Sequence, residues 1–186
     1  LPRTLSVIGG GVIGMEYATI FSALDVKVTV IDPAERILSF IDRELVDEFV
    51  HDLRDRGVSL RLESKVKRVT RSAPDACLIE LDDMRQIWSE MVLFAAGRKG
   101  ATDALELENC GLATDERGRI AVDRNTFRTK QPHIFAVGDV VGFPSLASTS
   151  MEQGRIAACH AFATPSQAPP EFFPYGIYSV PEMSII

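Results

Sequence analysis

The sequence has few of the residues that build covalent or metal-bound frameworks. It contains 3 cysteines and 3 histidines in 186 residues. The cysteines are widely spaced and form no C-x-x-C pair. This spacing indicates isolated thiols in a reducing compartment, which favours the cytoplasm. We therefore expect no disulfide, no metal site and no catalytic role for any of these side chains: Cys77, Cys110, Cys159, His51, His133 and His160.

Long hydrophobic runs are also missing. The longest, such as Met91 to Ala96, have the length of a strand and fall far short of the roughly 20 residues that a membrane-spanning helix needs. The first residues, Leu1 to Thr4, carry neither the charged nor the apolar region of a signal peptide. We therefore expect no membrane segment and a soluble protein.

Positive charge is in deficit. The sequence has 20 Lys and Arg against 26 Asp and Glu, a formal net charge of -6 and a pI near 5.1. Nucleic acids and anionic membranes would be repelled overall, so neither is expected as a partner. A hydrophobic content of 46% is enough for the core of one large or two small domains. We expect a globular protein that acts on small molecules.

The first residues predict a strand, a glycine turn, a helix and a second strand. Leu5 to Ile8 is a short apolar run before three glycines, and residues 12–21 are apolar at helical spacing. Val26 to Ile31 is rich in β-branched residues and ends at the turn signal Asp32-Pro33. Such a βαβ unit is typical of a parallel sheet with a right-handed crossover. We predict an α/β fold of the Rossmann type.

Three glycines, Gly9, Gly11 and Gly14, have the G-x-G-x-x-G spacing between this strand and this helix. Gly9 permits the tight turn, Gly11 lets a pyrophosphate approach the backbone, and Gly14 lets the helix pack closely on the strand. The amides of the first helical turn, at Val12 and Ile13, then face the phosphates together with the positive end of the helix dipole. The motif predicts dinucleotide binding; a purely structural glycine turn is the alternative.

Asp32 ends the second predicted strand, where a carboxylate accepts hydrogen bonds from adenosine ribose hydroxyls. This favours NAD, because the carboxylate would repel a 2'-phosphate ~5 Å away by on the order of 3 kcal/mol per unit charge at an effective dielectric of ~20. Arg36 lies four residues on and could bind that phosphate, offsetting the repulsion. NADP therefore stays open, and the alternative role for Asp32 is to start the turn at Pro33.

A second helix is expected after Asp42, which can cap it, and Gly57 is placed to end it. Its predicted buried stripe is Leu45, Val46, Phe49 and Leu53. Short β-type runs follow, the last of which returns to the parallel sheet. They cover residues 58–62, 66–70, 77–81, 87–88 and 91–96.

Past Gly97 the sequence becomes polar and rich in turn residues, so we place a domain boundary near residue 99. The second part is expected to contain a strand over 133–137, a turn at Gly138-Asp139 and a helix from about Leu146 to Phe162. Residues 164–174 are rich in proline and small residues and predict a connection. The predicted divisions are 1–99, 100–165 and 166–186.

The segment TKQPHIFAVGD, Thr129 to Asp139, resembles the second FAD motif of the flavoprotein disulfide reductase superfamily, the pyridine nucleotide-disulfide oxidoreductases. In that family a strand delivers a Gly-Asp pair to the cofactor, and the aspartate, here Asp139 after Gly138, hydrogen-bonds the ribityl chain of FAD. A carboxylate at the end of a strand is a good acceptor for a sugar-like hydroxyl. The segment AAGR, which contains Gly97, resembles the family's crossing from the nicotinamide domain to the flavin domain.

The resemblance implies further site residues. The helix after Asp139 begins near Leu146, Ala147 and Ser148, where the family aims backbone amides at the flavin pyrimidine oxygen. A helix N-terminus there would stabilise negative charge on the flavin ring. Glu16 matches a family glutamate near the nicotinamide and flavin; a surface glutamate is the alternative.

The family's architecture implies a Rossmann-like NAD(P)-binding domain, made of a parallel sheet and a β-meander, at residues 1–99. The second half of an FAD-binding domain would follow at 100–165, and a linker with the start of a dimerisation domain at 166–186. The implied cofactors are FAD, NAD and NADP. Because the N-terminal FAD half and the rest of the dimerisation domain are not found in the sequence, we expect it to be part of a longer, homo-oligomeric flavoprotein. Alone, it is expected to be inactive and to bind NAD weakly and FAD hardly at all.

Within the superfamily, the stretches GDVVGFPSLAS (138–148), EQGRIAA (152–158) and GIYSVPE (176–182) are most similar to soluble pyridine nucleotide transhydrogenases. Dihydrolipoamide dehydrogenases typically have a histidine where Ser148 stands. The likeness implies hydride transfer from NADPH to FAD and then to NAD+, chemistry that the cofactors carry without an obligatory acid or base from the chain. The alternatives are a dihydrolipoamide dehydrogenase and a non-catalytic dinucleotide-binding module.

Overall fold

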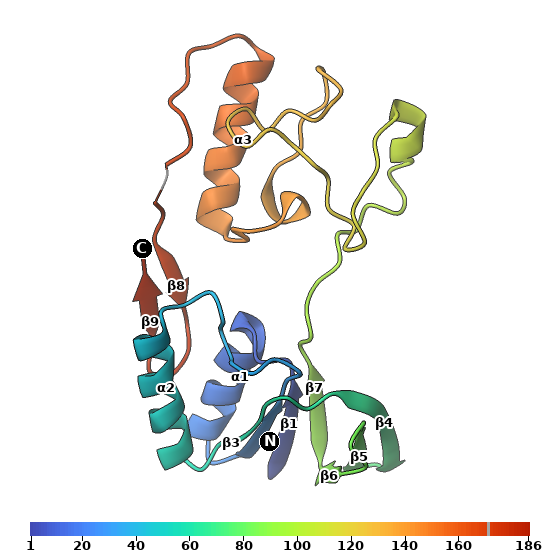
Figure 1. Ribbon diagram of the computed structural model, residues 1–186, viewed down its shortest axis with the longest axis vertical. Coiled ribbons are helices and arrows are strands. Elements are labelled where there is room, and N and C mark those ends of the chain that lie inside the picture. Colours follow the sequence, from blue (N-terminus) through green and yellow to red (C-terminus); the bar gives the residue numbers. More distant parts are fainter. Residues whose placement is uncertain (171) are drawn as a thin grey trace. The chain divides into compact units, whose positions relative to one another are not determined.

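The computed structural model describes residues 1–170 and 172–186. Residues 1–97 and 176–185 form one compact unit, here unit 1, and residues 98–175 with Ile186 form another, unit 2. Figure 1 shows the elements of each unit along the chain. The domain assignments 1–99, 100–165 and 166–186 stay predictions.

Unit 1 is built around a parallel sheet whose strands lie in the order β3-β2-β1-β7. All three strand pairs are parallel, so each connection has to cross over the sheet. Helices α1 and α2 supply two of these crossovers, and the α/β prediction of a Rossmann-like sheet is confirmed. The elements are β1 (Thr4–Ile8), α1 (Val12–Ala23), β2 (Lys27–Ile31), α2 (Arg43–Asp55), β3 (Ser59–Arg61) and β7 (Met91–Phe94).

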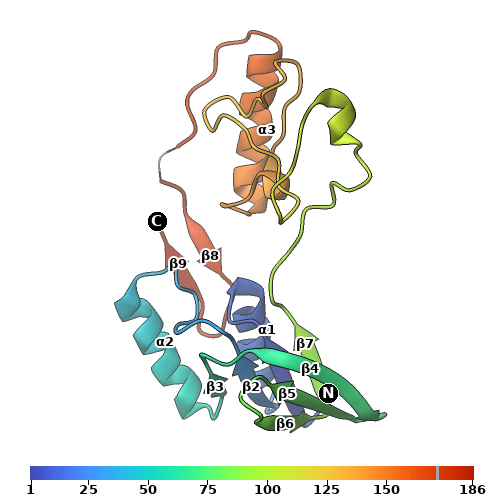
Figure 2. The same cartoon turned by 45° about the vertical axis from the view of Figure 1, so that its right-hand side comes forward.

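A three-stranded antiparallel meander packs on one face of this sheet, as Figure 2 shows. It comprises β4 (Val66–Ala73), β5 (Ala76–Leu81) and β6 (Gln86–Ser89). Ile79 and Leu81 of β5 form a buried cluster with Ile31 of β2, and Val92 of β7 packs against it. Successive side chains of a strand point to opposite faces of the sheet. The side chains of Ile31 and Val92 therefore mark the face that the meander covers, which is the face away from α1. The predicted meander is therefore present.

Helix α2 shows how local sequence sets both helix ends. Asp42 Oδ1 accepts a hydrogen bond from the Glu44 amide at 2.9 Å, and Gly57 follows the helix with a φ of +78°. The predicted stripe is right at Val46, Phe49 and Leu53, which are buried, but wrong at Leu45, which is 47% exposed. Leu45 lies about 100° around the helix from Val46, and only the i, i+3, i+7 row of Val46, Phe49 and Leu53 faces the core.

The C-terminal residues join unit 1 through helix α1. β8 (Tyr175–Ile177) and β9 (Met183–Ile185) form a two-stranded sheet. The segment between them is fixed by α1 side chains: Glu16 Oε1 accepts from the Tyr178 amide at 2.9 Å, and Thr19 Oγ1 accepts from the Val180 amide at 3.0 Å. Hydrogen bonds between residues about 160 positions apart thus close unit 1.

Unit 2 contains the 3-10 turns η1 (Leu107–Cys110) and η2 (Gly138–Val141) and the helix α3 (Ala147–Ala161). Helix α3 confirms the prediction for 146–162, but the predicted strand over 133–137 is wrong. This segment has a single isolated bridge, Arg128 to Phe135. Among the described residues no neighbouring strand supplies the rest of a ladder. It packs instead on α3, where Ile156 and Ala157 are buried with Phe127.

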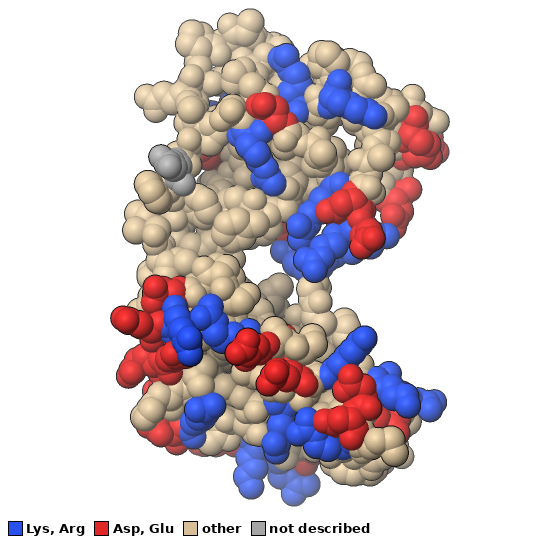
Figure 3. Space-filling model, in the orientation of Figure 1, with Lys and Arg blue, Asp and Glu red and all other residues tan. Residues whose placement is uncertain are grey.

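Basic and acidic side chains are interspersed on the face of each unit that Figure 3 shows. Within residues 1–170 and 172–186, no helix is long and apolar enough to cross a bilayer. In the same residues, no three His, Cys, Asp or Glu side chains are grouped so that they could hold a metal ion.

Candidate functional site

The turn between β1 and α1 accepts only glycine at two of the three predicted positions. Gly9 has a φ of +113°, and a Cβ there would overlap the Ala95 carbonyl. A Cβ on Gly14 would overlap the Gly9 carbonyl oxygen. Gly11 differs: its backbone is extended, and a Cβ would meet no described atom within 4 Å. Gly9 and Gly14 are thus required by packing, while Gly11 leaves its exposed face open to a ligand.

The N-terminus of α1 has no cap of its own. Gly11 is the N-cap, and among the described residues no side chain caps this end and no acidic residue lies in its first turn. The amides of Val12 and Ile13 therefore have no intrahelical acceptor. Helix α2 differs, because Asp42 and Glu44 serve its first turn. The start of α1 is a site where an anion would satisfy free donors and the helix dipole.

Asp32 lies at the end of β2 and is bound to the glycine turn. Its Oδ2 accepts a hydrogen bond from the Gly10 amide at 2.5 Å, and its Oδ1 accepts from the Ala34 amide at 2.7 Å. The second bond is the turn-forming role considered as the alternative. An ionised carboxylate has about four acceptor positions, so positions remain open to further donors. Gly10 was missed from sequence, although the run of three glycines signals it.

Arg36 hydrogen-bonds backbone carbonyls of the loop that follows β2. Its Nη2 donates to the Ser39 carbonyl at 3.1 Å and more weakly to the Ile41 carbonyl at 3.5 Å. The side chain also lines a groove of about 680 Å³ between this loop and α2, together with Arg43 and Arg54. The observed geometry gives Arg36 a structural task, and its contact with a 2'-phosphate stays a prediction.

The remaining unit 1 candidates lie around the same sheet. Glu16 is on the α1 face that fixes residues 178–180, so its carboxylate has a partner. Gly97 follows β7 with a φ of +118°, and a Cβ there would meet no described atom within 4 Å. Among the predicted residues and Gly10, the structure thus packs Gly14 against Gly9 and joins Asp32 to Gly10 by a hydrogen bond.

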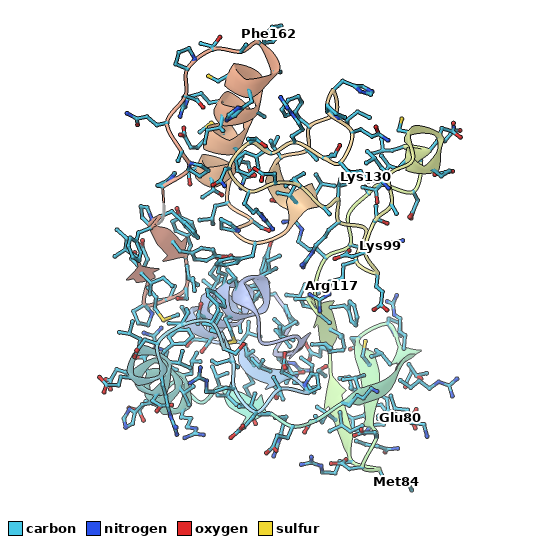
Figure 4. All side chains as sticks on the ribbon, turned by 45° about the horizontal axis from the view of Figure 1, so that its top comes forward. Glu80, Met84, Lys99, Arg117, Lys130 and Phe162 are labelled. Carbon is cyan, nitrogen blue, oxygen red and sulfur yellow. The ribbon has the colours of Figure 1, made fainter. Side chains whose placement is uncertain are left out.

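Asp139 occupies a groove in unit 2. The preceding Gly138 has a φ of +76° and opens η2. Asp139 Oδ2 forms an ion pair with Arg98 Nη1 at 2.6 Å. The groove, of about 590 Å³, is also lined by Lys99 and Arg119. Figure 4 labels Lys99 and Arg117, which lie on two adjacent segments of unit 2. The groove that holds Asp139 thus contains three basic side chains, and Arg98 pairs directly with the carboxylate.

The start of α3 resembles the start of α1 in its free amides. Leu146 is the N-cap, and the described residues place no side-chain cap and no acidic side chain at this end. Ala147 and Ser148 are exposed. The hydroxyls of Thr149 and Ser150 donate to the Leu146 carbonyl, so they do not compete for the amides. The three predicted residues at this end thus present open donors.

Two residues that sequence reasoning missed support the loop of Asp139. Gln153, only 6% exposed, accepts a hydrogen bond from the Gly138 amide through Oε1 at 2.7 Å. Arg124 donates to the Val141 carbonyl at 2.8 Å and to the Phe143 carbonyl at 3.3 Å. A polar residue within the apolar stripe of α3 was the available signal for Gln153.

The turn that carries Arg124 is held by a carboxylate. Asp123 Oδ1 accepts hydrogen bonds from the Thr126 hydroxyl at 3.0 Å, from the Thr126 amide at 2.9 Å and from the Asn125 amide at 3.0 Å. The Thr126 hydroxyl, followed by these amides, holds the pKa of the Asp123 carboxyl below its ordinary value. The ionised form of Asp123 is thus part of the folded turn.

The glycine turn, the uncapped start of α1 and the carboxylate at the end of β2 together define a dinucleotide-binding protein of the Rossmann type. A comparison with protein families identifies the class further: the sequence pattern of the family described as pyridine nucleotide-disulphide oxidoreductase matches residues 1–154. The chain belongs to this family.

Individual relatives agree with this assignment. The chain is 48% identical over 186 residues to the "Soluble pyridine nucleotide transhydrogenase" of Mycobacterium tuberculosis (strain ATCC 25177 / H37Ra). This match covers 100% of the chain and 39% of the relative. It is 41% identical over 186 residues to the protein of the same name from Shigella flexneri, covering 100% of the chain and 40% of that relative. The chain therefore spans about two fifths of the length of these relatives.

Solved structures have the same fold. LpdA from Mycobacterium tuberculosis superposes with a TM-score of 0.91 at 30% identity, over 99% of this chain and 40% of that one. The "HOCl-induced flavoprotein disulfide reductase RclA from Escherichia coli" superposes with a TM-score of 0.88 at 31% identity, over 99% of this chain and 42% of that one.

Proposed function

We propose that the protein containing this chain is an FAD-dependent soluble transhydrogenase, which transfers hydride from NADPH to NAD+ through FAD. The 186 residues form its nucleotide-binding portion. The observation that carries the proposal is the 48% identity to a soluble pyridine nucleotide transhydrogenase over the entire chain. The geometry supports it, because each unit contains an uncapped helix start beside a motif carboxylate, Asp32 in unit 1 and Asp139 in unit 2.

In unit 1 the chain binds and orients the nicotinamide nucleotide. The open face at Gly11 admits the pyrophosphate, and the free amides of Val12 and Ile13 donate to it. Asp32 accepts from the ribose hydroxyls while the Gly10 amide holds one of its oxygens in place. Use of both NAD and NADP would follow from a loop in which Arg36 lies four residues from this carboxylate.

In unit 2 the chain holds the flavin. Asp139 accepts hydrogen bonds from the ribityl hydroxyls. The amides at Leu146, Ala147 and Ser148 stabilise negative charge on the pyrimidine edge of the flavin. Bound FAD supplies the hydride acceptor and donor. No acid or base of the chain is needed for hydride transfer. We therefore give Glu16, whose carboxylate accepts from the Tyr178 amide, a positioning task and not a catalytic one.

The test uses the full-length protein. We expect it to purify with the visible absorbance of bound flavin and to reduce an NAD+ analogue with NADPH. Absence of flavin absorbance together with no hydride transfer would contradict the proposal and favour a binding module. Rapid oxidation of dihydrolipoamide with NAD+, without NADPH-dependent reduction of the analogue, would instead identify a dihydrolipoamide dehydrogenase.

Location and assembly belong to the same proposal. The names of the relatives describe soluble proteins, and we place this protein in the cytoplasm. We also propose a homo-oligomer whose contacts lie largely outside this chain. Light scattering on the full-length protein at micromolar concentration should give a mass of at least two subunits; a monomer would contradict the assembly.

A further inference from the structure

The backbone amide of Gly138 lies at a point where no regular structure can pair it. It is the first residue of η2, and the first amides of any helical turn have no acceptor within that turn. The residue is buried, so water does not hydrogen-bond its amide freely. An unpaired buried amide is costly, and a side-chain acceptor is the ordinary solution.

Gln153 provides that acceptor from the neighbouring helix. Its Oε1 lies 2.7 Å from the Gly138 nitrogen, and the side chain is 6% exposed. The next turn of α3 on the same face carries Ile156 and Ala157, both buried in an apolar cluster. Burying a glutamine in such a stripe costs free energy unless its polar atoms are paired. The position therefore favours glutamine because of what its oxygen binds.

The hydrogen bond to Gln153 holds Gly138, the residue directly before Asp139, whose side chain lines the groove. Gly138 has a φ of +76°, and a Cβ there would come within 3.3 Å of Ser150 Oγ, so its backbone lies close against α3. Asp139 follows directly and projects into the groove lined by Arg98. Because Gln153 holds the Gly138 amide, this hydrogen bond limits how far the backbone leading into Asp139 can rotate.

We propose that Gln153 is a positioning residue that orients Asp139 toward the flavin by accepting the hydrogen bond of the Gly138 amide. This inference rests on the proposed function, because it takes Asp139 to bind the ribityl chain. Gln153 itself is buried, with its side-chain oxygen on the Gly138 amide. Its effect is transmitted through one backbone amide, so it should depend entirely on the presence of the Asp139 side chain.

The test is a double-mutant cycle in the full-length flavoprotein. The variants are Gln153→Met, which keeps the shape and loses the acceptor, Gln153→Glu, which keeps an acceptor, Asp139→Ala, and the double variant Q153M/D139A. The apparent dissociation constant for FAD is measured by titrating each apoprotein. We expect Q153M to raise it about tenfold, in line with the loss of one buried hydrogen bond, and Q153E to leave it within about threefold. In the D139A background Q153M should have no further effect.

A spectroscopic readout accompanies the titration. The visible circular dichroism of bound flavin reports its local environment, and we expect it to change in Q153M but not in Q153E. An equal loss of affinity from Q153M with and without the Asp139 side chain would mean a merely structural role and overturn the proposal. Wild-type affinity in Q153M, or a loss in Q153E as large as in Q153M, would overturn it as well.

Two further outcomes are covered. If Q153M does not fold, Gln153→Ala, which leaves room for water beside the amide, takes its place in the cycle. Failure of both variants to fold while Q153E folds would assign Gln153 to general stability and overturn the proposal. A full-length protein that holds no flavin, or a D139A variant that binds FAD normally, would contradict the proposed function itself. If D139A weakens FAD binding and Q153M does not, only the role of Gln153 is contradicted.

Discussion

At the scale of single residues, the glycines of the first turn separate packing from binding. A Cβ at Gly14 would overlap the Gly9 carbonyl, whereas a Cβ at Gly11 would meet open space. The two positions thus have different physical reasons to be glycine, which the sequence motif by itself does not distinguish. Matched alanine substitutions can tell them apart.

We predict that Gly14→Ala destabilises unit 1 by about 1–3 kcal/mol, because the added methyl forces helix and strand apart. Gly11→Ala should change the free energy of unfolding by less than about 1 kcal/mol but weaken NAD binding, since the methyl occupies the pyrophosphate approach. Urea unfolding and calorimetric titration with NAD+ measure the two effects. Equal destabilisation by both substitutions would contradict the distinction.

Asp123 offers a test of an electrostatic cause. The Thr126 hydroxyl is the largest of the contributions that lower the pKa of its carboxyl. Thr126→Val removes that donor and should raise the Asp123 pKa toward its ordinary value, as measured by NMR titration of the side-chain carboxyl carbon. Asn125→Ala keeps its backbone amide and serves as the control, with an unchanged pKa.

The same shift has a consequence for stability against pH. Because the folded pKa of Asp123 lies below the unfolded value, this turn contributes stability above the unfolded pKa, and the contribution is lost as the pH falls through the folded pKa. Thr126→Val should reduce that part of the acid dependence. An identical acid-unfolding profile in both proteins would argue against it.

At the scale of elements, the three helices differ in how their N-termini are served. Helix α2 is capped by Asp42 and has Glu44 in its first turn, whereas α1 and α3, among the described residues, have neither a side-chain cap nor a first-turn acid. A side-chain cap stabilises the end of a helix that binds no ligand. Where the cap is absent, the first backbone amides stay free as donors for a ligand. Within the described residues, α2 thus has its first amides served by its own side chains, whereas α1 and α3 keep theirs free, as the proposed function requires.

For α2 we predict that Asp42→Ala lowers the free energy of unfolding by about 1 kcal/mol, because the Glu44 amide loses its acceptor. The control is Asp47→Ala, which removes an exposed ion pair with Arg43 and should cost less than about 0.5 kcal/mol. Thermal unfolding followed by circular dichroism compares the two. Equal losses would show that the cap has no special weight.

At the scale of the whole molecule, residues distant in sequence complete unit 1. Thr19 is fully buried and accepts a hydrogen bond from the Val180 amide, and Glu16 accepts from the Tyr178 amide. Residues 176–185 therefore belong with the first 97 residues, although 78 residues of unit 2 lie between them in the chain. The C-terminal segment is part of the nucleotide-binding unit's packing.

We predict that Thr19→Val, which keeps the shape of the side chain, leaves the Val180 amide without an acceptor and destabilises the segment by about 1–3 kcal/mol. Amide hydrogen exchange of residues 178–180 should become faster. Ser22→Ala, one turn further along α1, is the control and should leave this exchange unchanged. Unaltered protection in Thr19→Val would mean that the hydrogen bond does not hold the segment.

The sequence by itself determined the Rossmann-type βαβ unit, the cap and end of α2, the extent of α3 and the positions of both motif carboxylates. These features depend on periodicity, turn residues and motif spacing, which act over a few residues along the chain. The same local rules also predicted a strand at 133–137, which has only an isolated bridge, because a strand requires partners that its own sequence does not specify.

Only the tertiary structure decided which groups distant in sequence bind one another. It paired Asp32 with the Gly10 amide, Arg98 with Asp139, and Gln153 with the amide of Gly138, across separations of 22, 41 and 15 positions. It also exposed Leu45 beside a stripe of buried neighbours. Hydrogen bonds and burial depend on distances in space, and these are set when the elements pack, so local sequence patterns do not specify them.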